Sequence, residues 1–320
     1  MALIDRFGRL INYLRISVTD RCNFRCIYCM PKEGIAWKPM EEILTYEQIR
    51  DFVDVAAKLG IEKIKLTGGE PLVRRGLDRL VEMLSQIKGI KEISLTTNGS
   101  LLKNYAKNLK KAGLSRITVS LDTLKKDKFR LISRLGNLDD VFEGFDALFD
   151  AGFENSKINT VVMKGINDDE VIELVEFAIS RGVDIRFIEF MPTDTVKNWQ
   201  SYFVSINDVK RMIAERFLLK PSQKSSNGPA VYFDVENISV GFITPLSKNF
   251  CSQCNRVRLS SDGYIIPCLG HSDKIDVKSY LRKGDLEGVM KAIIEAIEIK
   301  PKEHALLKEP IHSSMSSVGG

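Results

Sequence analysis

Hydrophobic and polar positions in the first 200 residues alternate between two periodicities. Short runs rich in aliphatic and β-branched residues predict strands at 14–19, 63–67, 92–96, 116–121, 157–163 and 183–190. Amphipathic segments predict helices at 45–59, 76–87, 101–112, 141–151 and 168–181, the last with Asp168 and Asp169 at its N-terminal cap. Strands that alternate with helices predict βαβ units and a parallel sheet. We count six units, two fewer than a closed (β/α)8 barrel requires.

Polar residues gather where the predicted strands end. They are Thr19, Asp20, Thr67, Glu70, Thr96, Asn98, Ser120, Asp122 and Glu189. Barrels and open α/β sheets both place their chemistry beyond the carboxyl ends of the strands. A single residue of this kind is more often a turn or cap residue, but several at the same end predict one shared pocket.

The character of the chain changes near residue 200. A polar break at 222–229 precedes two strand-like runs, 230–235 and 238–244, and the tail from Pro310 to Gly320 is small and polar. We therefore predict a partial barrel over 1–200, a C-terminal extension over 201–309 and a mobile tail over 310–320.

Composition narrows the class of protein. The 320 residues include 47 Lys and Arg against 42 Asp and Glu, a net charge of +5, with 44% hydrophobic residues, so the chain as a whole is not intrinsically disordered. No apolar run approaches the ~18–20 residues of a membrane helix, and Asp5 lies where a signal peptide would begin its apolar stretch. We expect a cytoplasmic protein without membrane contact. A mild excess of positive charge suits a small polyanion better than a nucleic acid.

Cysteines form two groups of three: Cys22, Cys26 and Cys29, then Cys251, Cys254 and Cys268. A large cytosolic protein is not expected to use them as disulfides. Structural zinc needs four ligands, and only His271 offers a credible fourth. An iron–sulfur cluster fits better, because three thiolates can hold a cubane and leave one iron open to a small molecule. The C-x3-C-x2-C spacing of the first group, after a strand, is a strong signal; C-x2-C-x13-C is less specific by itself.

Longer motifs carry a resemblance to a known family. The loop Cys22-Asn-Phe-Arg-Cys26-Ile-Tyr28-Cys29 is similar to the cluster motif of the radical S-adenosylmethionine (SAM) superfamily. Further matches, in the same order, are Thr67–Pro71, Thr96–Gly99, Val119–Asp122, Lys164–Asp168, Arg186–Met191, Phe250–Gly263 and the closing Gly319–Gly320. Over nearly the whole chain they resemble the MoaA family of GTP 3′,8-cyclases. The first motif specifies only the superfamily. The second cysteine group, its two arginines and the closing diglycine narrow the resemblance to this family.

The resemblance implies an α/β fold, an incomplete (β/α)6 TIM-type barrel with a C-terminal extension, and two [4Fe–4S] clusters. The first cluster, on Cys22, Cys26 and Cys29, would bind SAM and, after reduction by an external electron donor, generate a 5′-deoxyadenosyl radical. The SAM contacts carried over from the family are Tyr28, Gly69, Ser120 and Met191.

The second cluster, on Cys251, Cys254 and Cys268, would bind GTP. In the implied reaction the radical takes the ribose 3′ hydrogen and the C3′ radical attacks guanine C8. The product is (8S)-3′,8-cyclo-7,8-dihydroguanosine 5′-triphosphate. The implied activity is that of a lyase, and this reaction is the first step of molybdenum cofactor biosynthesis. The GTP contacts carried over are Arg15, Lys65, Thr96, Lys157, Arg256, Val257 and Arg258, and Gly319 and Gly320 are implied to assist catalysis.

The resemblance also implies a hand-off of the product to a cyclic pyranopterin monophosphate synthase, by a monomer or homodimer. Two alternatives stay open. A radical SAM peptide-modifying maturase usually has more cysteines in its extension than the three present here. A non-enzymatic zinc-binding or RNA-binding protein would contain no iron.

Overall fold

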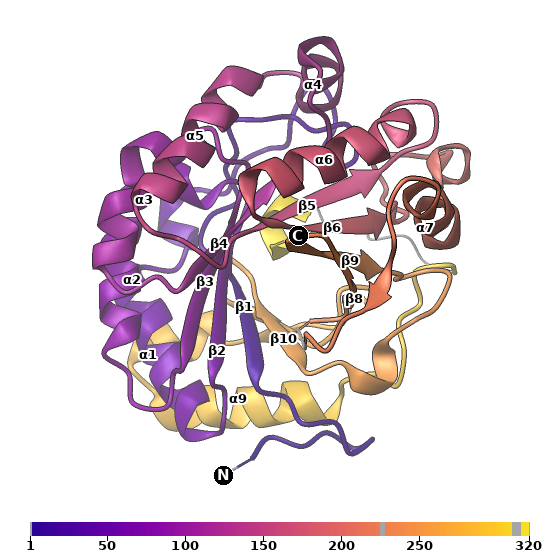
Figure 1. Ribbon diagram of the computed structural model, residues 1–320. Helices are drawn as coiled ribbons and strands as arrows, with labels where there is room; N and C mark the ends of the chain where they lie inside the picture. Colours follow the sequence, from indigo (N-terminus) through magenta and orange to yellow (C-terminus); the bar gives the residue numbers. More distant parts are fainter. Residues whose placement is uncertain (1, 225–227, 309–314, 320) are drawn as a thin grey trace.

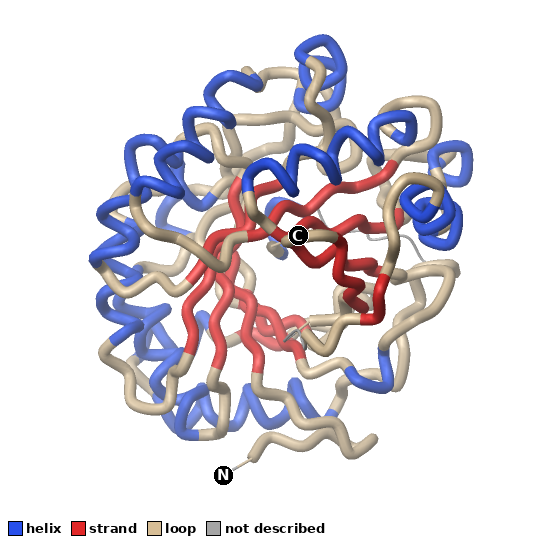
Figure 2. Tube along the Cα trace, viewed as in Figure 1, coloured by secondary structure: helices blue, strands red, loops and turns tan. Residues whose placement is uncertain are grey.

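The computed structural model describes residues 2–224, 228–308 and 315–319. The predicted strands are present as β1 (Tyr13–Ser17), β2 (Lys63–Thr67), β3 (Glu92–Thr97), β4 (Arg116–Ser120), β5 (Lys157–Val162) and β6 (Asp184–Glu189). Each pairs in parallel with the next along the chain. Strands form the inner wall and helices the outer layer (Figures 1 and 2). The predicted α/β fold with a parallel, barrel-like sheet is confirmed.

The outer layer consists of α1 (Tyr46–Lys58), α2 (Leu77–Ser85), α3 (Leu102–Lys111), α4 (Lys126–Ser133), α5 (Leu138–Asp150) and α6 (Val171–Arg181). A capping box starts α1, with Thr45 and Gln48 exchanging hydrogen bonds. The charge-rich helix α4 was not predicted. The predicted cap of α6 is wrong: Asp168 and Asp169 lie inside a 3-10 turn (Asp168–Glu170), and the Asp168 carboxylate accepts from Gly165 N at 2.8 Å.

The C-terminal part extends the same sheet at both edges. Strand β9 (Ile238–Ile243) pairs in parallel with β6, and β10 (Arg256–Leu259) pairs in parallel with β1. Within the described residues, eight neighbouring strands therefore run parallel. Antiparallel strands continue outward as β8 (Val231–Val235), β7 (Lys220–Pro221), β11 (Tyr264–Ile266) and β12 (Ile275–Asp276). Helices α7 (Ile206–Ala214), α8 (Lys278–Lys283) and α9 (Leu286–Glu298) complete the outer layer, and other 3-10 turns are Met40–Glu42, Pro71–Val73, Trp199–Tyr202 and Cys251–Gln253.

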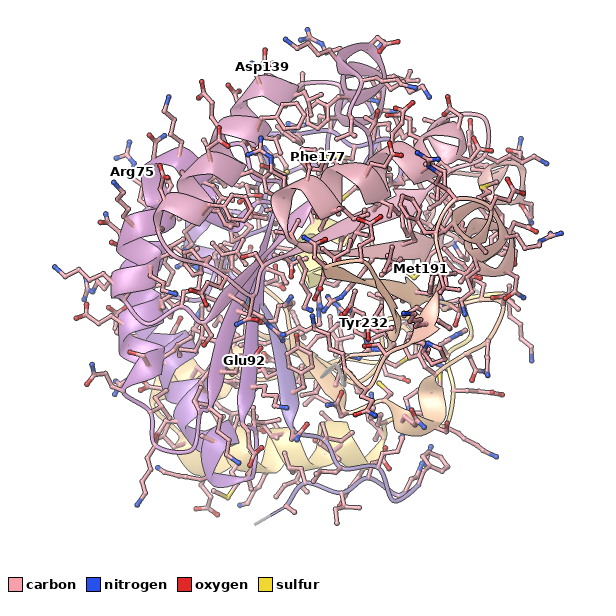
Figure 3. The ribbon with its side chains drawn as sticks, viewed as in Figure 1. Arg75, Glu92, Asp139, Phe177, Met191 and Tyr232 are labelled. Carbon is pink, nitrogen blue, oxygen red and sulfur yellow. The ribbon has the colours of Figure 1, made fainter. Side chains whose placement is uncertain are left out.

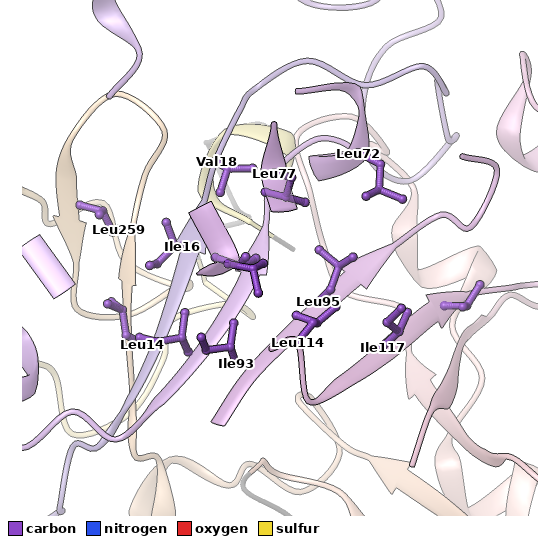
Figure 4. Close-up of a cluster of buried hydrophobic side chains, with 14 of the residues drawn as sticks. Leu14, Ile16, Val18, Leu72, Leu77, Ile93, Leu95, Leu114, Ile117 and Leu259 are labelled. Carbon is purple, nitrogen blue, oxygen red and sulfur yellow. The ribbon is translucent and has the colours of Figure 1, made fainter. Parts of the chain in front are cut away.

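A continuous hydrophobic core lies between the strands and the outer helices. In β1, Leu14 and Ile16 are fully buried in it, beside Ile93 and Leu259 (Figure 4). Side chains of a strand alternate between its two faces. The intervening Arg15 therefore points into the barrel, where it lines a cavity. The apolar residues of each strand pack outward against the helices, and this fixes which polar residues of the strand face the barrel interior.

The C-terminal turn α10 (Met315–Val318) lies inside the ring of strands, next to β1 (Figure 1). Ser17 Oγ donates to the carbonyl of Ser316 at 3.4 Å. The Arg258 guanidinium donates to the carbonyls of Val318, at 3.2 Å, and of Gly319. Gly320 lies outside the described residues. In the described part of the chain, none of the helices has the length and apolar character needed to span a bilayer.

Candidate active site

A cavity of about 220 Å³ opens at the carboxyl ends of β1 to β6. All three cysteines of the first group line it, together with the four residues predicted to contact SAM, namely Tyr28, Gly69, Ser120 and Met191. The structure brings these seven residues together from four separate stretches of sequence. Their individual roles stay predictions.

The first cysteine loop is a tight turn braced by its neighbours. Cys29 N and Met30 N both donate to Cys26 O, at 2.9 and 3.2 Å. All six cysteines are free thiols. Burial raises the pKa of Cys22 to about 12 and that of Cys29 to about 11. Thiolates in such a half-buried site need a compensating cation, and iron supplies one. The donor set fits an iron–sulfur cluster.

Gly68 and Gly69 are required by the packing of the chain on itself. A Cβ on Gly68, whose φ is +150°, would lie 2.5 Å from Thr19 O, and one on Gly69 would overlap Arg21 O. Gly69 N donates to Thr19 O at 2.8 Å. These two glycines therefore bring the end of β2 against the start of the cysteine loop, in addition to lining the cavity.

Three buried carboxylates line this cavity, namely Glu70, Asp122 and Glu189. Glu70 accepts from Thr97 Oγ1 and Asn98 N, each at 2.7 Å, and burial raises its pKa to about 7. Asp122 accepts from Tyr28 Oη at 2.7 Å, and burial raises its pKa to about 6. Sequence reasoning placed Glu70 and Asp122 at strand ends and inside the motifs Thr67–Pro71 and Val119–Asp122 but gave them no role.

A second cavity continues into the barrel and is basic. It is lined by Arg15, Lys65, Arg116, Arg186, Arg256 and Arg258. It shares Thr96, Asn159, Ile188, Met191 and Met315 with the first cavity, so the two form one continuous space. Sequence reasoning missed Arg116 and Arg186. Each is a charge on a strand whose neighbouring positions are apolar, the pattern that had singled out Lys65.

Crowding of like charges marks this space as an anion site. Burial and the neighbouring Arg186 and Arg15 hold the pKa of Lys65 well below its ordinary value. Burial lowers the pKa of Arg15 to about 10. Lys65 Nζ donates to Thr118 Oγ1 at 3.1 Å, a neutral partner. A polyanion would relieve this repulsion and restore the charged forms.

Two predicted GTP contacts lie elsewhere. Lys157 Nζ pairs with Asp184 at 2.5 Å and lies 5.1 Å from the ring centre of Tyr232, which is labelled in Figure 3. Burial lowers its pKa to about 8. Val257 packs into the hydrophobic core on the outer face of β10. Neither side chain lines the basic cavity, so only the backbone of Val257 is available to a ligand there.

Two buried cations organise the second cysteine group. Arg9 donates to the carbonyls of Cys251, at 2.8 Å, and Pro301, at 2.7 Å. Lys300 Nζ donates to the carbonyls of Arg256, at 2.8 Å, and Pro267. The carbonyls of Cys251, Arg256 and Pro267 belong to the segments that hold the cysteines, whereas Pro301 directly follows Lys300. Sequence reasoning had no signal for either cation, because each acts on backbone far away along the chain.

The second group differs electrically from the first. Although burial raises the pKa of Cys254, the charges of Arg256 and Lys300 lower it to about 7. His271, the candidate fourth zinc ligand, is engaged by Glu303 O at 3.0 Å through Nε2. Over the described residues, no three His, Cys, Asp or Glu side chains converge on a single metal ion. A cubane has a different requirement, since each thiolate binds its own iron.

Comparison with known proteins assigns the chain to a family. The radical SAM superfamily matches residues 16–178, and the family described as Molybdenum Cofactor Synthesis C matches residues 183–306. The GTP 3′,8-cyclase of Thermodesulfovibrio yellowstonii is 46% identical over 321 residues, which cover 99% of each chain. That of Petrotoga mobilis is 44% identical over 323 residues, covering 99% of this chain and 100% of the relative.

Solved structures agree on the fold. SuiB of Streptococcus suis, bound to S-adenosylmethionine, superimposes with a TM-score of 0.63 over 88% of this chain and 66% of that one. Its identity is 19%, so the likeness concerns the fold alone. Radical SAM membership implies SAM and one [4Fe–4S] cluster, for which the first cysteine group is suited. With relatives matched along their full length, this chain belongs to the GTP 3′,8-cyclase family of radical SAM enzymes.

Proposed function

We propose that this chain cyclises GTP to (8S)-3′,8-cyclo-7,8-dihydroguanosine 5′-triphosphate, the first step of molybdenum cofactor biosynthesis. The observation that carries the proposal is the continuous space with two unlike ends. One end holds three cysteines and three buried carboxylates, and the other holds six cations. A radical formed at one end therefore meets a triphosphate-bearing substrate held at the other.

At the first end, Cys22, Cys26 and Cys29 would hold the cluster, with SAM beside Tyr28, Gly69, Ser120 and Met191. When bound, this pair supplies a 5′-deoxyadenosyl radical for hydrogen abstraction from the substrate. The chain's own residues shape and shield the space. Glu70 anchors the β3–α3 turn through Thr97 and Asn98, and Asp122 fixes the Tyr28 hydroxyl. Rigid walls keep a reactive group from alternative partners.

At the second end, the cations would bind the triphosphate. Guanidinium forks match phosphate oxygens, and several converging charges offset the roughly four negative charges of GTP. Arg15, Arg256 and Arg258 lie on the adjacent strands β1 and β10, in register at Tyr13–Arg256 and Arg15–Arg258. Holding ribose and base at fixed positions supplies most of the catalytic advantage, because the bond between C3′ and C8 forms within one molecule.

A second [4Fe–4S] cluster on Cys251, Cys254 and Cys268 is part of the proposal, with guanine as the ligand of its open iron. Support comes from Arg256, which follows Cys254 by two residues and lines the basic cavity. Thr96 lines both cavities, as expected of a residue beside the reacting ribose. We further propose a cytoplasmic enzyme that hands its product to a cyclic pyranopterin monophosphate synthase.

An anaerobic incubation with SAM, dithionite and GTP tests this function. Mass spectrometry should find 5′-deoxyadenosine and a cyclised guanine nucleotide in equal amounts. Deoxyadenosine without the nucleotide would assign another substrate. Iron and sulfide analysis should find about eight irons per chain for two cubanes; four would remove the second cluster from the proposal, and zinc without iron would remove the whole function.

A matched pair of variants tests the anion site. Arg186→Gln removes a cation that lines the basic cavity, whereas Arg181→Gln removes one on the outer surface that pairs with Asp146. The first should raise KM for GTP about 10- to 100-fold, the range of one charge-assisted contact. The second should leave it unchanged. Equal KM values in the two variants would place the triphosphate elsewhere.

A further inference from the structure

Positive charge is concentrated in one segment that the catalytic site does not use. Residues 124–136 contain five Lys and Arg and one Asp, a net charge of +4, against +5 for the whole chain. The segment forms α4 and the turn after it. Arg134 in that turn has a φ of +62°, a conformation that non-glycine residues adopt only when the surroundings demand it.

This segment forms the outer cover of the first cysteine loop. Arg25 N donates to Ser133 O at 2.9 Å, and Ile27 N donates to Ile132 O at 3.0 Å. The Arg134 guanidinium donates to the carbonyls of Arg25, at 3.2 Å, and Met30, at 3.0 Å. Two backbone bonds and a bridging arginine thus join α4 to the loop that carries Cys26 and Cys29. The positive φ of Arg134 serves this contact.

Carboxylates neutralise only part of the charge. Lys126 pairs with Asp139, labelled in Figure 3, at 2.7 Å, and Lys128 pairs with Asp169 at 2.5 Å. Lys125 lies 3.5 Å from Glu173. Within the described residues, five other cations around the loop form no ion pair with a carboxylate. They are Arg21, Arg25, Lys32, Arg130 and Arg134.

The same segment carries two exposed leucines, Leu131 next to Arg130 and Leu135 next to Arg134. Leu131 is 57% exposed and Leu135 is 58% exposed; of the residues between them, Ile132 and Ser133 are buried and Arg134 is partly buried. Arg130 and Lys32 are also exposed. We call Lys32, Arg130, Leu131 and Leu135 the α4 face. An apolar centre with a charged rim is the usual anatomy of a protein interface, and interfaces of electron carriers are small and short-lived.

We propose that the α4 face docks an acidic one-electron carrier protein, which reduces the cluster held by the first cysteine group. The inference rests on the proposed function, because that function needs one electron at the first cluster. The step moves one electron: the carrier is oxidised, the cluster is reduced, and no atom is transferred. SAM would fill the cavity that the cysteines line, and the segment after Arg130 is hydrogen-bonded to the loop that carries them, so we place the carrier at this segment. Its positive charge selects an acidic partner and accelerates encounter.

Charge reversal with two reductants tests the dock. The double variant Lys32→Glu/Arg130→Glu is compared with Lys107→Glu/Lys111→Glu, which makes the same change on exposed positions of α3. Stopped-flow absorbance follows reduction of the cluster by reduced flavodoxin, an acidic carrier, and by reduced methyl viologen, a small cation. At low ionic strength the first variant should be reduced by flavodoxin at least about tenfold more slowly than wild type, and the control at the wild-type rate. High salt should shrink the difference. Viologen should reduce all three proteins at comparable rates.

Each remaining outcome contradicts either docking at the α4 face or the proposed GTP-cyclising function. Equal slowing of both double variants would show a general charge effect and overturn the dock, as would no slowing in either. Binding of a labelled RNA oligonucleotide that only the first variant loses, with flavodoxin rates unchanged, would assign the face to nucleic acid instead. A wild-type protein without iron, or one that viologen reduces without SAM cleavage, would defeat the proposed function and leave the docking question separate.

Discussion

The two cysteine groups use the same ligand in opposite surroundings. The first lies beside Glu70 and Asp122, and its thiols have raised pKa values. In the second, burial raises the pKa of Cys251, but at Cys254 burial is outweighed by the charges of Arg256 and Lys300, which lower the pKa to about 7. Acidic groups suit a sulfonium and an amino group, and basic groups suit a triphosphate. Spacing of the cysteines predicts the kind of cluster, but the neighbouring charges decide what each end of the cavity attracts.

Because the surroundings differ, we expect loss of a cysteine from each group to affect the reaction differently. Loss from the first group should abolish all activity. Cys22→Ser should abolish formation of 5′-deoxyadenosine and of the cyclised nucleotide, because a hydroxyl is a poor iron ligand at a site built for thiolates. Chromatography of the anaerobic reaction measures both. Retention of substantial SAM cleavage would show that the first cluster is held by other residues.

Loss of the second group should separate the two products. Cys254→Ser should keep more SAM cleavage than cyclisation, since the first group and its cavity are untouched. Iron analysis identifies the cluster that is lost, and the ratio of deoxyadenosine to cyclised nucleotide measures the separation. An equal fall of both products would contradict the division of labour between the ends.

The tail joins the two ends, and Gly319 is its tightest point. Its φ is +73°, and a Cβ there would overlap Thr67 Oγ1. Gly319→Ala should lower cyclisation by about 100-fold, the cost of an ångström-scale misplacement near reacting atoms, while both clusters stay in place. Gly152→Ala is the matched control, because its φ is +74° with nothing within 4 Å of the added Cβ. Equal cyclisation by the two variants would remove the tail from catalysis.

Lys300 should matter to the second group alone. Lys300→Met leaves the carbonyls of Arg256 and Pro267 without their donor and should lower the free energy of unfolding by about 1–3 kcal/mol. Denaturant titration measures this, and EPR should show a changed second signal beside an unchanged first one. Lys291→Met, an exposed change on α9, is the control and should resemble wild type. A first-cluster signal altered as much as the second would show that the effect is global.

The smallest expected effect is a pH dependence from Lys157, which does not line the basic cavity but contacts the ring of Tyr232, as Arg186 does. The pKa of Lys157 is lowered to about 8, so the side chain is charged below pH 8 and loses its charge as the pH rises through that value. If Lys157 attracts GTP, KM should rise about tenfold between pH 7 and pH 9. Lys157→Arg, which stays charged, should flatten the profile. SAM cleavage measured over the same range should not follow this change, and a rise in KM kept by Lys157→Arg would exclude Lys157 as its source.

Strand positions were predictable because buried apolar runs leave a local signal. The expected strand at 157–163 is β5 (Lys157–Val162), and the expected helix at 101–112 contains α3 (Leu102–Lys111). Helix α4 was missed because it is short and rich in charged residues, which leaves a weak apolar pattern. Its end is held by hydrogen bonds to the cysteine loop, which is distant in sequence. The start of α6 was misjudged because Asp168 bonds to Gly165 rather than capping the helix.

Among the site residues too, those in local motifs were predictable and those with partners distant in sequence were not. The four SAM positions share one cavity because motifs at strand ends converge wherever strands run parallel. Lys157 could not be placed from sequence, since its partner Asp184 lies 27 residues away on β6. Arg116 belongs to no motif, and Arg186 begins one but was given no role; only the closing of strands around one axis brings both beside Lys65.

The sequence by itself determined the alternation of strands and helices, the two cysteine groups and the family, because these depend on local periodicity and spacing. Only the tertiary structure decided which charges surround each group, that β9 and β10 widen the sheet, and that the tail enters the barrel. Electrostatic environments arise from residues distant in sequence, so burial and proximity, rather than spacing, separate an acidic end from a basic one.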